Sequence, residues 1–412
     1  MQSLYSMIRK QRHFVAIFAC ALFLLLAWWG GLRTSFGLLL KILNEENLWS
    51  VAFLSIVQSF NLLFYGFFMP FIGWALRKKP KIDFVILVAG IILIGSGLCF
   101  AAQSSTQQIF FLSYGVLFGL GMTFLSPTVF NALITRVFLP YRTILIGIAS
   151  AGMGIAMLVL LPLIQAILKQ SGWQNGLNLL GGFTFLGCLP LISLAFWSSR
   201  SLSKQPIASA TGNKLRNNVE IPALFTKTYW ILLAGMPALE FFTIQLFVTH
   251  LINLFIVNGI SLGEATLMFS SVGAINVLGR VISGYLLSRS WVAEVAAINY
   301  CGLFLAILAA ILLPYQPKVC AVMIICGLGT CWATIIPLST ETIVRAVGAA
   351  NFPLVYGFAE SMIGFLGAAG AAVGGISYER LGSYTASLLA ALCCGVLSLW
   401  CYLKVFVKVN PK

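Results

Sequence analysis

Twelve long apolar runs follow one another along this sequence of 412 residues, and each is long enough to cross a membrane. An α-helix needs about 20 mostly apolar residues to span the hydrocarbon core of a bilayer. Only 8 % of the residues are charged, whereas an average soluble domain has about 25 %. The sequence therefore predicts an integral membrane protein and excludes an ordinary soluble enzyme and a disordered chain. The runs cover residues 14–38, 48–76, 82–102, 108–135, 143–167, 176–198, 226–257, 263–288, 292–313, 318–344, 351–376 and 383–406.

A polar segment separates the runs into two sets of six. We predict an all-α fold in which twelve transmembrane helices form two pseudo-symmetric six-helix bundles, residues 1–198 and 226–412, joined by a cytosolic linker, residues 199–225. Several positions recur at an offset of 209–211 residues, which indicates two parallel repeats related by an axis along the membrane normal. The pairs are Gly73 and Gly284, Pro127 and Pro337, Arg136 and Arg345, Gly147 and Gly357, and Gly172 and Gly382.

The basic residues predict the orientation of the chain. It has 25 Lys and Arg against 10 Asp and Glu, a net charge of +15, and this charge lies in short clusters between the apolar runs. With the N-terminus in the cytoplasm, nineteen of the Lys and Arg fall on the cytoplasmic side and four on the outer side. Cytoplasmic loops of membrane proteins carry such an excess. We therefore predict a multi-pass cell (inner) membrane protein with both termini cytoplasmic, and no binding to nucleic acid.

Twelve helices, a central polar loop and a repeat of six plus six resemble the major facilitator superfamily. The segment from Gly73 to Lys81 is similar to the family's basic signature between helices 2 and 3, and a second copy runs from Gly284 to Arg289. The resemblance implies alternating access and places Arg77 and Arg289 at a cytoplasmic gate. Arg77 and Ser288 stand where the signature has Asp, so the family's cytoplasmic latch is altered here.

A closer resemblance is to the oxalate:formate antiporter and monocarboxylate porter branch. Arg280 stands four residues before Gly284, where that branch has an arginine that binds the substrate carboxylate. Tyr356 and the small residues that follow it are similar to helix 11 of the branch, so the resemblance adds Tyr356 to the substrate-binding candidates. Some relatives carry a proton-coupling Asp where this chain has Asn276, and the antiporter's helix-11 Lys is replaced by Ile363.

Charged and polar side chains inside the predicted spans give the other substrate-binding candidates. A charge at mid-bilayer costs about 2.5–3.5 kcal/mol on insertion scales, so it marks a partner or a cavity. Arg280 offers a guanidinium fork that fits a carboxylate, and the alternative is an ion pair with Glu360. Arg33, which stands among glycines and Ser and Thr residues, either lines the cavity as a second cationic group or extends toward the outer headgroups. Asn276 shares a helix face with Arg280, and His250 either binds substrate or packs as a neutral group.

Titratable side chains and one charge pair in the predicted spans give the candidate coupling and gating residues. Glu240, Glu360 and His250 are candidate proton carriers, and each carboxyl group could instead sit neutral and hydrogen-bonded in a helix contact. Glu341 and Arg345 are four residues apart, which places them on one helix face as a pair near the cytoplasmic gate.

These features predict a secondary active transporter of a small organic anion, a mono- or polycarboxylate, working by alternating access with proton coupling or exchange. The alternative is an exporter of a drug-like compound or a carboxylate siderophore. A membrane-embedded enzyme or a receptor finds no support, because no nucleophile–base set, metal-ligand spacing or nucleotide fingerprint is present. We expect no cofactor and no metal; the expected partners are the organic anion, the lipid bilayer and protons, and the expected state is a monomer.

Overall fold

A computed structural model describes residues 2–78, 82–137, 142–203 and 227–409 of the chain. Within these ranges the chain forms helices and no strand. In chain order the elements are α1 (Gln2–Thr34), α2 (Phe36–Glu46), α3 (Val51–Lys78), α4 (Asp83–Ala102), α5 (Gln107–Phe110), the π-helix η2 (Phe111–Phe118), α6 (Gly119–Phe124), α7 (Pro127–Val137), α8 (Arg142–Phe183), the π-helix η4 (Thr184–Cys188), α9 (Leu189–Ser203), α10 (Lys227–Val257), α11 (Leu262–Ser288), α12 (Val292–Leu312), α13 (Pro317–Leu381) and α14 (Thr385–Val409).

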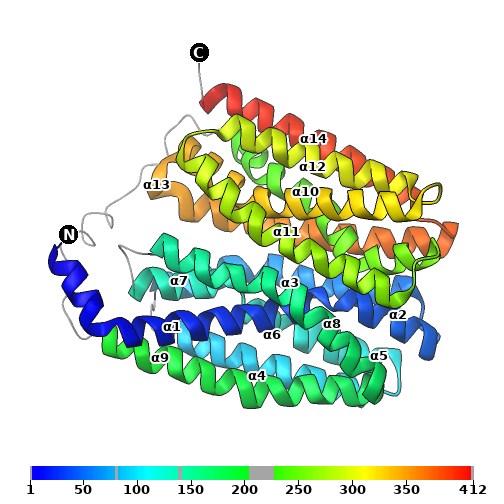
Figure 1. Cartoon of the computed structure of the whole chain (residues 1–412), viewed down its shortest axis with the longest axis horizontal. Coiled ribbons are helices and arrows are strands. Elements are labelled where there is room, and N and C mark those ends of the chain that lie inside the picture. Colours follow the sequence, from blue (N-terminus) through cyan, green and yellow to red (C-terminus); the bar gives the residue numbers. More distant parts are fainter. Residues whose placement is uncertain (1, 79–81, 138–141, 204–226, 410–412) are drawn as a thin grey trace.

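The predicted membrane spans are confirmed. Among the described residues, 11 helical stretches are long and apolar enough to cross a membrane. One of them, Leu145–Arg200, contains two spans, because Gly172 breaks it with a φ of 75°. The 65-residue helix α13 also holds two spans, Pro317–Val347 and Val355–Leu381, which run back past each other (Figure 1). The fold is thus a twelve-span, all-α membrane bundle, as the apolar runs predict.

The two halves are visible as two bundles, with α1–α9 in one and α10–α14 in the other (Figure 1). Gly172 and its repeat partner Gly382 both have a positive φ, 75° and 65°, which suits glycine because it lacks a Cβ. The repeat therefore preserves a glycine with a positive φ after span 5 and after span 11, although ψ differs between the two, 160° and 11°. Helix α9 continues to Ser203, so the first residues of the predicted linker are helical; residues 204–226 lie outside the described ranges.

Several spans are broken helices. Span 1 divides at Ser35 into α1 and α2, where the Thr34 hydroxyl group donates to the Gly30 carbonyl at 2.9 Å. Such hydroxyl-to-backbone bonds bend helices. Span 4 contains the π-helix η2 and divides again before Pro127, which cannot donate a helical hydrogen bond. The break in span 1 lies directly beside Arg33.

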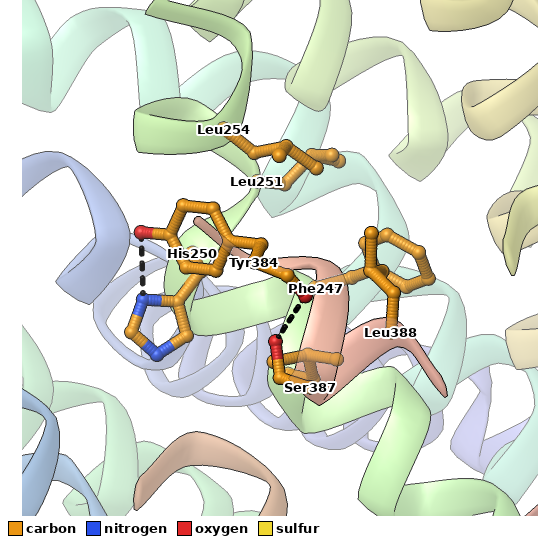
Figure 2. A pocket seen from close by; sticks show the side chains of 8 residues that line it. Phe247, His250, Leu251, Leu254, Tyr384, Ser387 and Leu388 are labelled. Atoms are coloured by element: carbon orange, nitrogen blue, oxygen red, sulfur yellow. Dashed lines mark hydrogen bonds between the residues drawn. The ribbon is translucent and has the colours of Figure 1, made fainter. Parts of the chain in front are cut away.

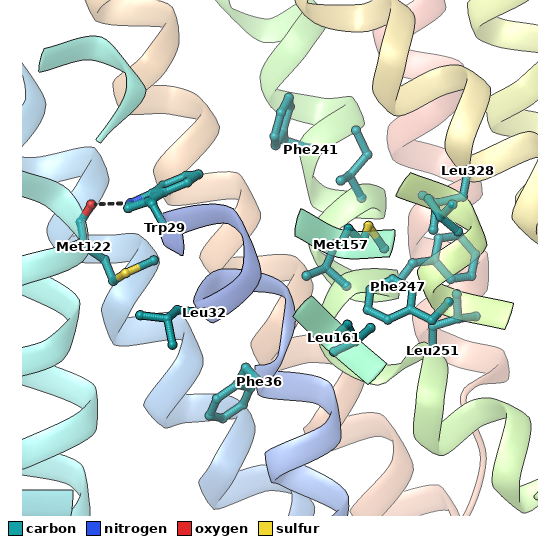
Figure 3. Close-up of a cluster of buried hydrophobic side chains, with 14 of the residues drawn as sticks. Trp29, Leu32, Phe36, Met122, Met157, Leu161, Phe241, Phe247, Leu251 and Leu328 are labelled. Atoms are coloured by element: carbon teal, nitrogen blue, oxygen red, sulfur yellow. Dashed lines mark hydrogen bonds between the residues drawn. The ribbon is translucent and has the colours of Figure 1, made fainter. Parts of the chain in front are cut away.

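One cluster of buried apolar side chains includes residues of both bundles, and Figure 3 shows part of it. Trp29 of α1 is 7 % exposed, and its indole N–H donates to the carbonyl of Met122 in α6 at 2.8 Å. This bond satisfies a polar group that burial would otherwise leave unpaired. It also fixes the rotation of α1, and therefore the direction in which Arg33, one turn later, projects.

The first turn of α1 and the last turn of α14 lie at the same end of the molecule, which we call the inner end (Figure 1). Away from that end the two halves touch closely. A Cβ added at Gly37 of α2 would lie 2.9 Å from the carbonyl oxygen of Thr249 in α10. A Cβ at Gly66 of α3 would lie 2.8 Å from the carbonyl oxygen of Ser361 in α13. Only glycine permits this approach of the two backbones.

Toward the inner end the halves separate. A Cβ added at any of the four glycines at the inner parts of spans 2, 5, 8 and 11 would meet no atom within 4 Å. Seven residues separate the span 2 glycine from Gly66, so both lie on the face that contacts the other half. The structure is therefore open between the halves at the inner end and closed at the outer end. The four glycines are Gly73, Gly147, Gly284 and Gly357.

Candidate functional site

Six polar side chains from both halves meet where the halves begin to separate, and we call them the central cluster. α1 and α3 of the first half supply two of them, and α11 and α13 of the second half supply four. Their neighbours along the helices are the contact glycines on one side and the separated glycines on the other. The cluster therefore lies at the closed end of the inner opening. Its members are Arg33, Tyr65, Asn276, Arg280, Tyr356 and Glu360.

Arg33 is held in the interior by two aromatic rings. Its guanidinium carbon lies 5.1 Å from the centre of the Trp29 ring and 5.7 Å from that of the Tyr65 ring. The Tyr65 hydroxyl group donates to Glu360 Oε2 at 2.7 Å, and this bond crosses from one half to the other. Arg33 also interacts electrostatically with Glu360. Because Arg33 faces this partner and not the outer surface, the headgroup alternative is not supported.

Arg280 occupies the other side of the cluster. Its Nε donates to Asn276 Oδ1 at 2.8 Å, one turn earlier in α11. Tyr356 lies close enough to interact with both Arg280 and Glu360, so it connects the two sides of the cluster. Asn276 is 5 % exposed, and its Nδ2 has no hydrogen-bond partner among the described residues. A buried donor without a partner is costly unless a ligand uses it.

The charge of the central cluster is positive. It contains two guanidinium groups and one carboxyl group, and both arginines are only partly buried. Among the described residues Arg280 is bonded to Asn276 and forms no ion pair, so its terminal N–H groups suit a ligand. The arrangement suits an anion that reaches the cluster from the inner opening.

The structure does not bring His250 into this cluster. His250 of α10 lies toward the outer end, 2 % exposed, with Nε2 at 2.9 Å from the carbonyl oxygen of Ala371. Its Nδ1 lies 3.4 Å from the Tyr384 hydroxyl group (Figure 2). Ser55 of the first half approaches Nε2 at 3.4 Å. His250 therefore belongs to the closed outer contact, beside a small pocket that is mostly apolar, and its predicted binding and coupling roles stay predictions.

Glu240 is also separate from the central cluster. It is fully buried within the second bundle, where Asn299 of α12 donates from Nδ2 to Glu240 Oε2 at 2.9 Å. The structure thus distributes the three candidate proton carriers over three places, and only Glu360 contacts a candidate substrate-binding residue.

The predicted gating residues lie near the inner end. Arg345 Nε and Glu341 Oε1 are 2.7 Å apart, so the expected ion pair is present. Arg289 ends α11, and its guanidinium group lies 5.5 Å from the centre of the Tyr285 ring of the same helix. The side chain of Arg77 lies outside the described part of the chain. These contacts stay within the second half, so they do not join the halves in this conformation.

Sequence inspection missed Tyr65. A tyrosine in an apolar span has no pattern that separates a packing ring from a ligand of a carboxylate. Its place immediately before Gly66 becomes informative only with the structure, in which Gly66 contacts the backbone of the other half.

A contact between the halves at the outer end yields a first prediction. Glu379 at the outer end of α13 accepts a hydrogen bond of 2.8 Å from the backbone N–H of Ala52, in the first turn of α3. A carboxylate is stabilised at a helix N-terminus. We expect Glu379→Gln to weaken the closure of the outer end and to shift the population about two- to five-fold toward the outward-open state. Thiol labelling of a cysteine placed at Ser59, which donates across the halves to Ala368, measures this; unchanged labelling would contradict the expectation.

The comparisons with known proteins agree with this architecture. The sequence profile of the Major Facilitator Superfamily matches residues 13–371. The chain belongs to the Major Facilitator Superfamily. Monocarboxylate transporter 13 of Rattus norvegicus is 26 % identical over 330 residues, which cover 78 % of this chain and 72 % of that one. Monocarboxylate transporter 12 of Xenopus laevis is 26 % identical over 259 residues. The chain spans only 56 % of the length of this frog relative.

Solved structures of other members share the fold of this superfamily chain. A D-xylose-proton symporter superposes with a TM-score of 0.71 at 15 % identity, covering 94 % of this chain and 97 % of that one. A bacterial homologue of the human lysosomal transporter Spinster gives a TM-score of 0.69 at 16 % identity, covering 97 % and 99 %. At such identities the likeness establishes the fold only, and the substrate has to be argued from the central cluster.

Proposed function

We propose that this protein is a secondary active transporter of a small organic anion, in the first place a monocarboxylate. The observation that carries the proposal is the central cluster, which holds two arginines from opposite halves at the closed end of the inner opening, with Arg33 beside Glu360 and Arg280 bonded to Asn276. Guanidinium groups bind carboxylates through paired, charge-assisted hydrogen bonds. The monocarboxylate transporter relatives support the same substrate class.

In this mechanism the anion binds between Arg33 and Arg280. Asn276 Nδ2 is a further donor for it, because this atom has no other hydrogen-bond partner among the described residues. Each arginine belongs to a different half, so a bound anion draws the halves together at the inner end. Closing that end and opening the outer contacts gives alternating access. Tyr356 lies beside Arg280, and its substrate-binding role is part of the proposal. The substrate-binding role of His250 is not.

Glu360 is the proposed coupling group. As a carboxylate it competes with the substrate for Arg33 and repels an anion, whereas as a neutral acid it does neither. The anion therefore binds best when Glu360 carries a proton. One proton then moves with each monovalent anion, so that transport does not work against the membrane potential, which opposes anion entry by about 2.3 kcal/mol per charge per 100 mV.

Counterflow in proteoliposomes tests the substrate class. We expect vesicles loaded with an unlabelled monocarboxylate such as lactate to take up labelled lactate, and a lipophilic cationic dye to compete poorly. Dye efflux without lactate counterflow would favour the exporter alternative, which the buried acids Glu240 and Glu360 would suit. The cell (inner) membrane, the cytoplasmic termini, the monomeric state and the division at residues 199–225 stay predictions.

A further inference from the structure

A second polar group lies inside the second bundle, away from the central cluster. Glu240 of α10, Asn299 of α12 and Thr334 of α13 are 0–3 % exposed. They form a chain in which Thr334 Oγ1 lies 2.6 Å from Asn299 Oδ1, and Asn299 Nδ2 lies 2.9 Å from Glu240 Oε2. The proposed transport mechanism uses none of these three residues.

Glu240 lacks the partners that a buried carboxylate needs. Its Oε1 has no hydrogen-bond partner among the described residues, and no Lys or Arg of that part of the chain forms an ion pair with it. The titratable groups that face it are Tyr300 of α12 and Cys331 of α13, neither of which is a cation. On the side of α14, Ser398 bonds to Tyr300 and not to Glu240. Burying an ionised group without compensation costs several kcal/mol.

The amide of Asn299 can take two orientations in this chain. Thr334 Oγ1 lies 2.6 Å from Asn299 Oδ1 and 2.8 Å from the carbonyl oxygen of Thr330. A hydroxyl group has one hydrogen and cannot donate to both oxygens. The oxygen and nitrogen of an asparagine amide exchange places by a half-turn, and the hydrogen-bond network determines which orientation is correct.

With the amide of Asn299 turned, Thr334 and Asn299 each still donate one hydrogen bond, as they do in the orientation of the structure. Thr334 donates to the Thr330 carbonyl, which is the usual bond of a threonine to the preceding turn. Asn299 Nδ2 then donates to Thr334 Oγ1, and Asn299 Oδ1 faces Glu240 Oε2. In that orientation the two oxygens require a hydrogen between them, which only the carboxyl group can supply. In the other orientation Glu240 Oε1 still has no partner among the described residues, so a neutral carboxyl group avoids an uncompensated charge in both.

We propose that Glu240, Asn299 and Thr334 form a proton-binding site inside the second bundle, distinct from the central cluster, and that Glu240 is a neutral acid in the inward-open conformation. The ligand is a proton exchanged with solvent. Its loading bears on the transport cycle because the same helix, α10, forms the outer contact with Gly37 of the first half. Loss of the proton leaves an uncompensated charge in a helix that must pack against both bundles.

Infrared spectroscopy of the purified full-length protein tests the proposal. A protonated carboxyl group gives a carbonyl stretching band that a carboxylate lacks. We expect wild type at neutral pH to show a band that Glu240→Gln removes and that Thr334→Val shifts. Glu341→Gln is the matched control and should remove no acid band, because Glu341 is ion-paired with Arg345. If Glu240→Gln does not fold, Glu240→Asp keeps the carboxyl group and assigns the band through its shift.

An acid band that neither substitution of Glu240 alters would contradict the proposal. It would show that Glu240 is ionised and that the proton site does not exist.

Thermal unfolding gives a second measurement. A neutral buried acid stabilises the fold at low pH, and this contribution is lost as pH rises, whereas Glu240→Gln should make the melting temperature less dependent on pH. Both measurements are made without substrate, so a failure of the carboxylate-transport proposal leaves them unaffected.

Discussion

Replacing Arg280 by alanine is expected to abolish transport of carboxylate anions while leaving the folded protein intact. Removing one partner of a buried, hydrogen-bonded charge pair costs about 2–5 kcal/mol in a complex, which weakens binding by about 30-fold or more. Arg280 contributes no ion pair to the fold among the described residues, and its bond to Asn276 lies within one helix. Counterflow of labelled lactate in proteoliposomes measures the loss, and size-exclusion chromatography measures folding.

Arg380→Ala is the matched control for this substitution. Arg380 is exposed at the outer end of α13. Its replacement removes the same charge from the chain as Arg280→Ala does, without affecting the central cluster. We expect its counterflow to equal that of wild type. Counterflow retained in Arg280→Ala would refute the anchoring role of Arg280 and leave only the superfamily architecture established.

Glu360→Gln is expected to separate exchange from accumulation. Glutamine keeps a hydrogen-bond acceptor for Tyr65 but cannot gain or lose a proton, so the variant resembles the permanently protonated site. In wild type, an imposed gradient of one pH unit should drive about tenfold accumulation of a monovalent anion if one proton moves with it, since one pH unit is worth about 1.4 kcal/mol. The variant should show no accumulation, yet should exchange labelled for unlabelled anion at a rate within about twofold of wild type.

Net uptake and exchange are measured in the same proteoliposomes with and without the pH gradient. Glu45→Gln is a suitable control, because Glu45 is exposed and pairs with Lys41 of its own helix. Accumulation that persists in Glu360→Gln would place the coupling proton elsewhere. Loss of exchange together with accumulation would instead make Glu360 a part of the binding geometry rather than the coupling group.

Much of the architecture could be predicted from the sequence because the membrane imposes a strong physical constraint. In hydrocarbon each backbone polar group must be satisfied within its own segment, so runs of apolar residues translate directly into helices. The repeat could also be predicted from the sequence, because Gly172 and Gly382 recur at matching positions and both have a positive φ, which favours glycine. The broken helices were not predicted, because the break at Ser35 depends on local hydroxyl-to-backbone bonds.

The candidate site was predictable in its parts and not in its grouping. A charge in a membrane span is rare enough that Arg33, Arg280, Glu240, Glu360 and His250 stand out in the sequence alone. Their spacing along the chain does not say which of them meet. Helix rotation and packing between the halves place Arg33 and Glu360 together through Tyr65, and leave Glu240 and His250 in separate surroundings.

By itself the sequence determined the membrane fold, the two repeats and the residue types able to bind an anion, because burial in lipid penalises every exception to apolar composition. Only the tertiary structure decided which titratable groups share a site and toward which end the halves open. Those two properties depend on contacts between helices that are hundreds of residues apart, where a glycine such as Gly66 meets the backbone of the other half.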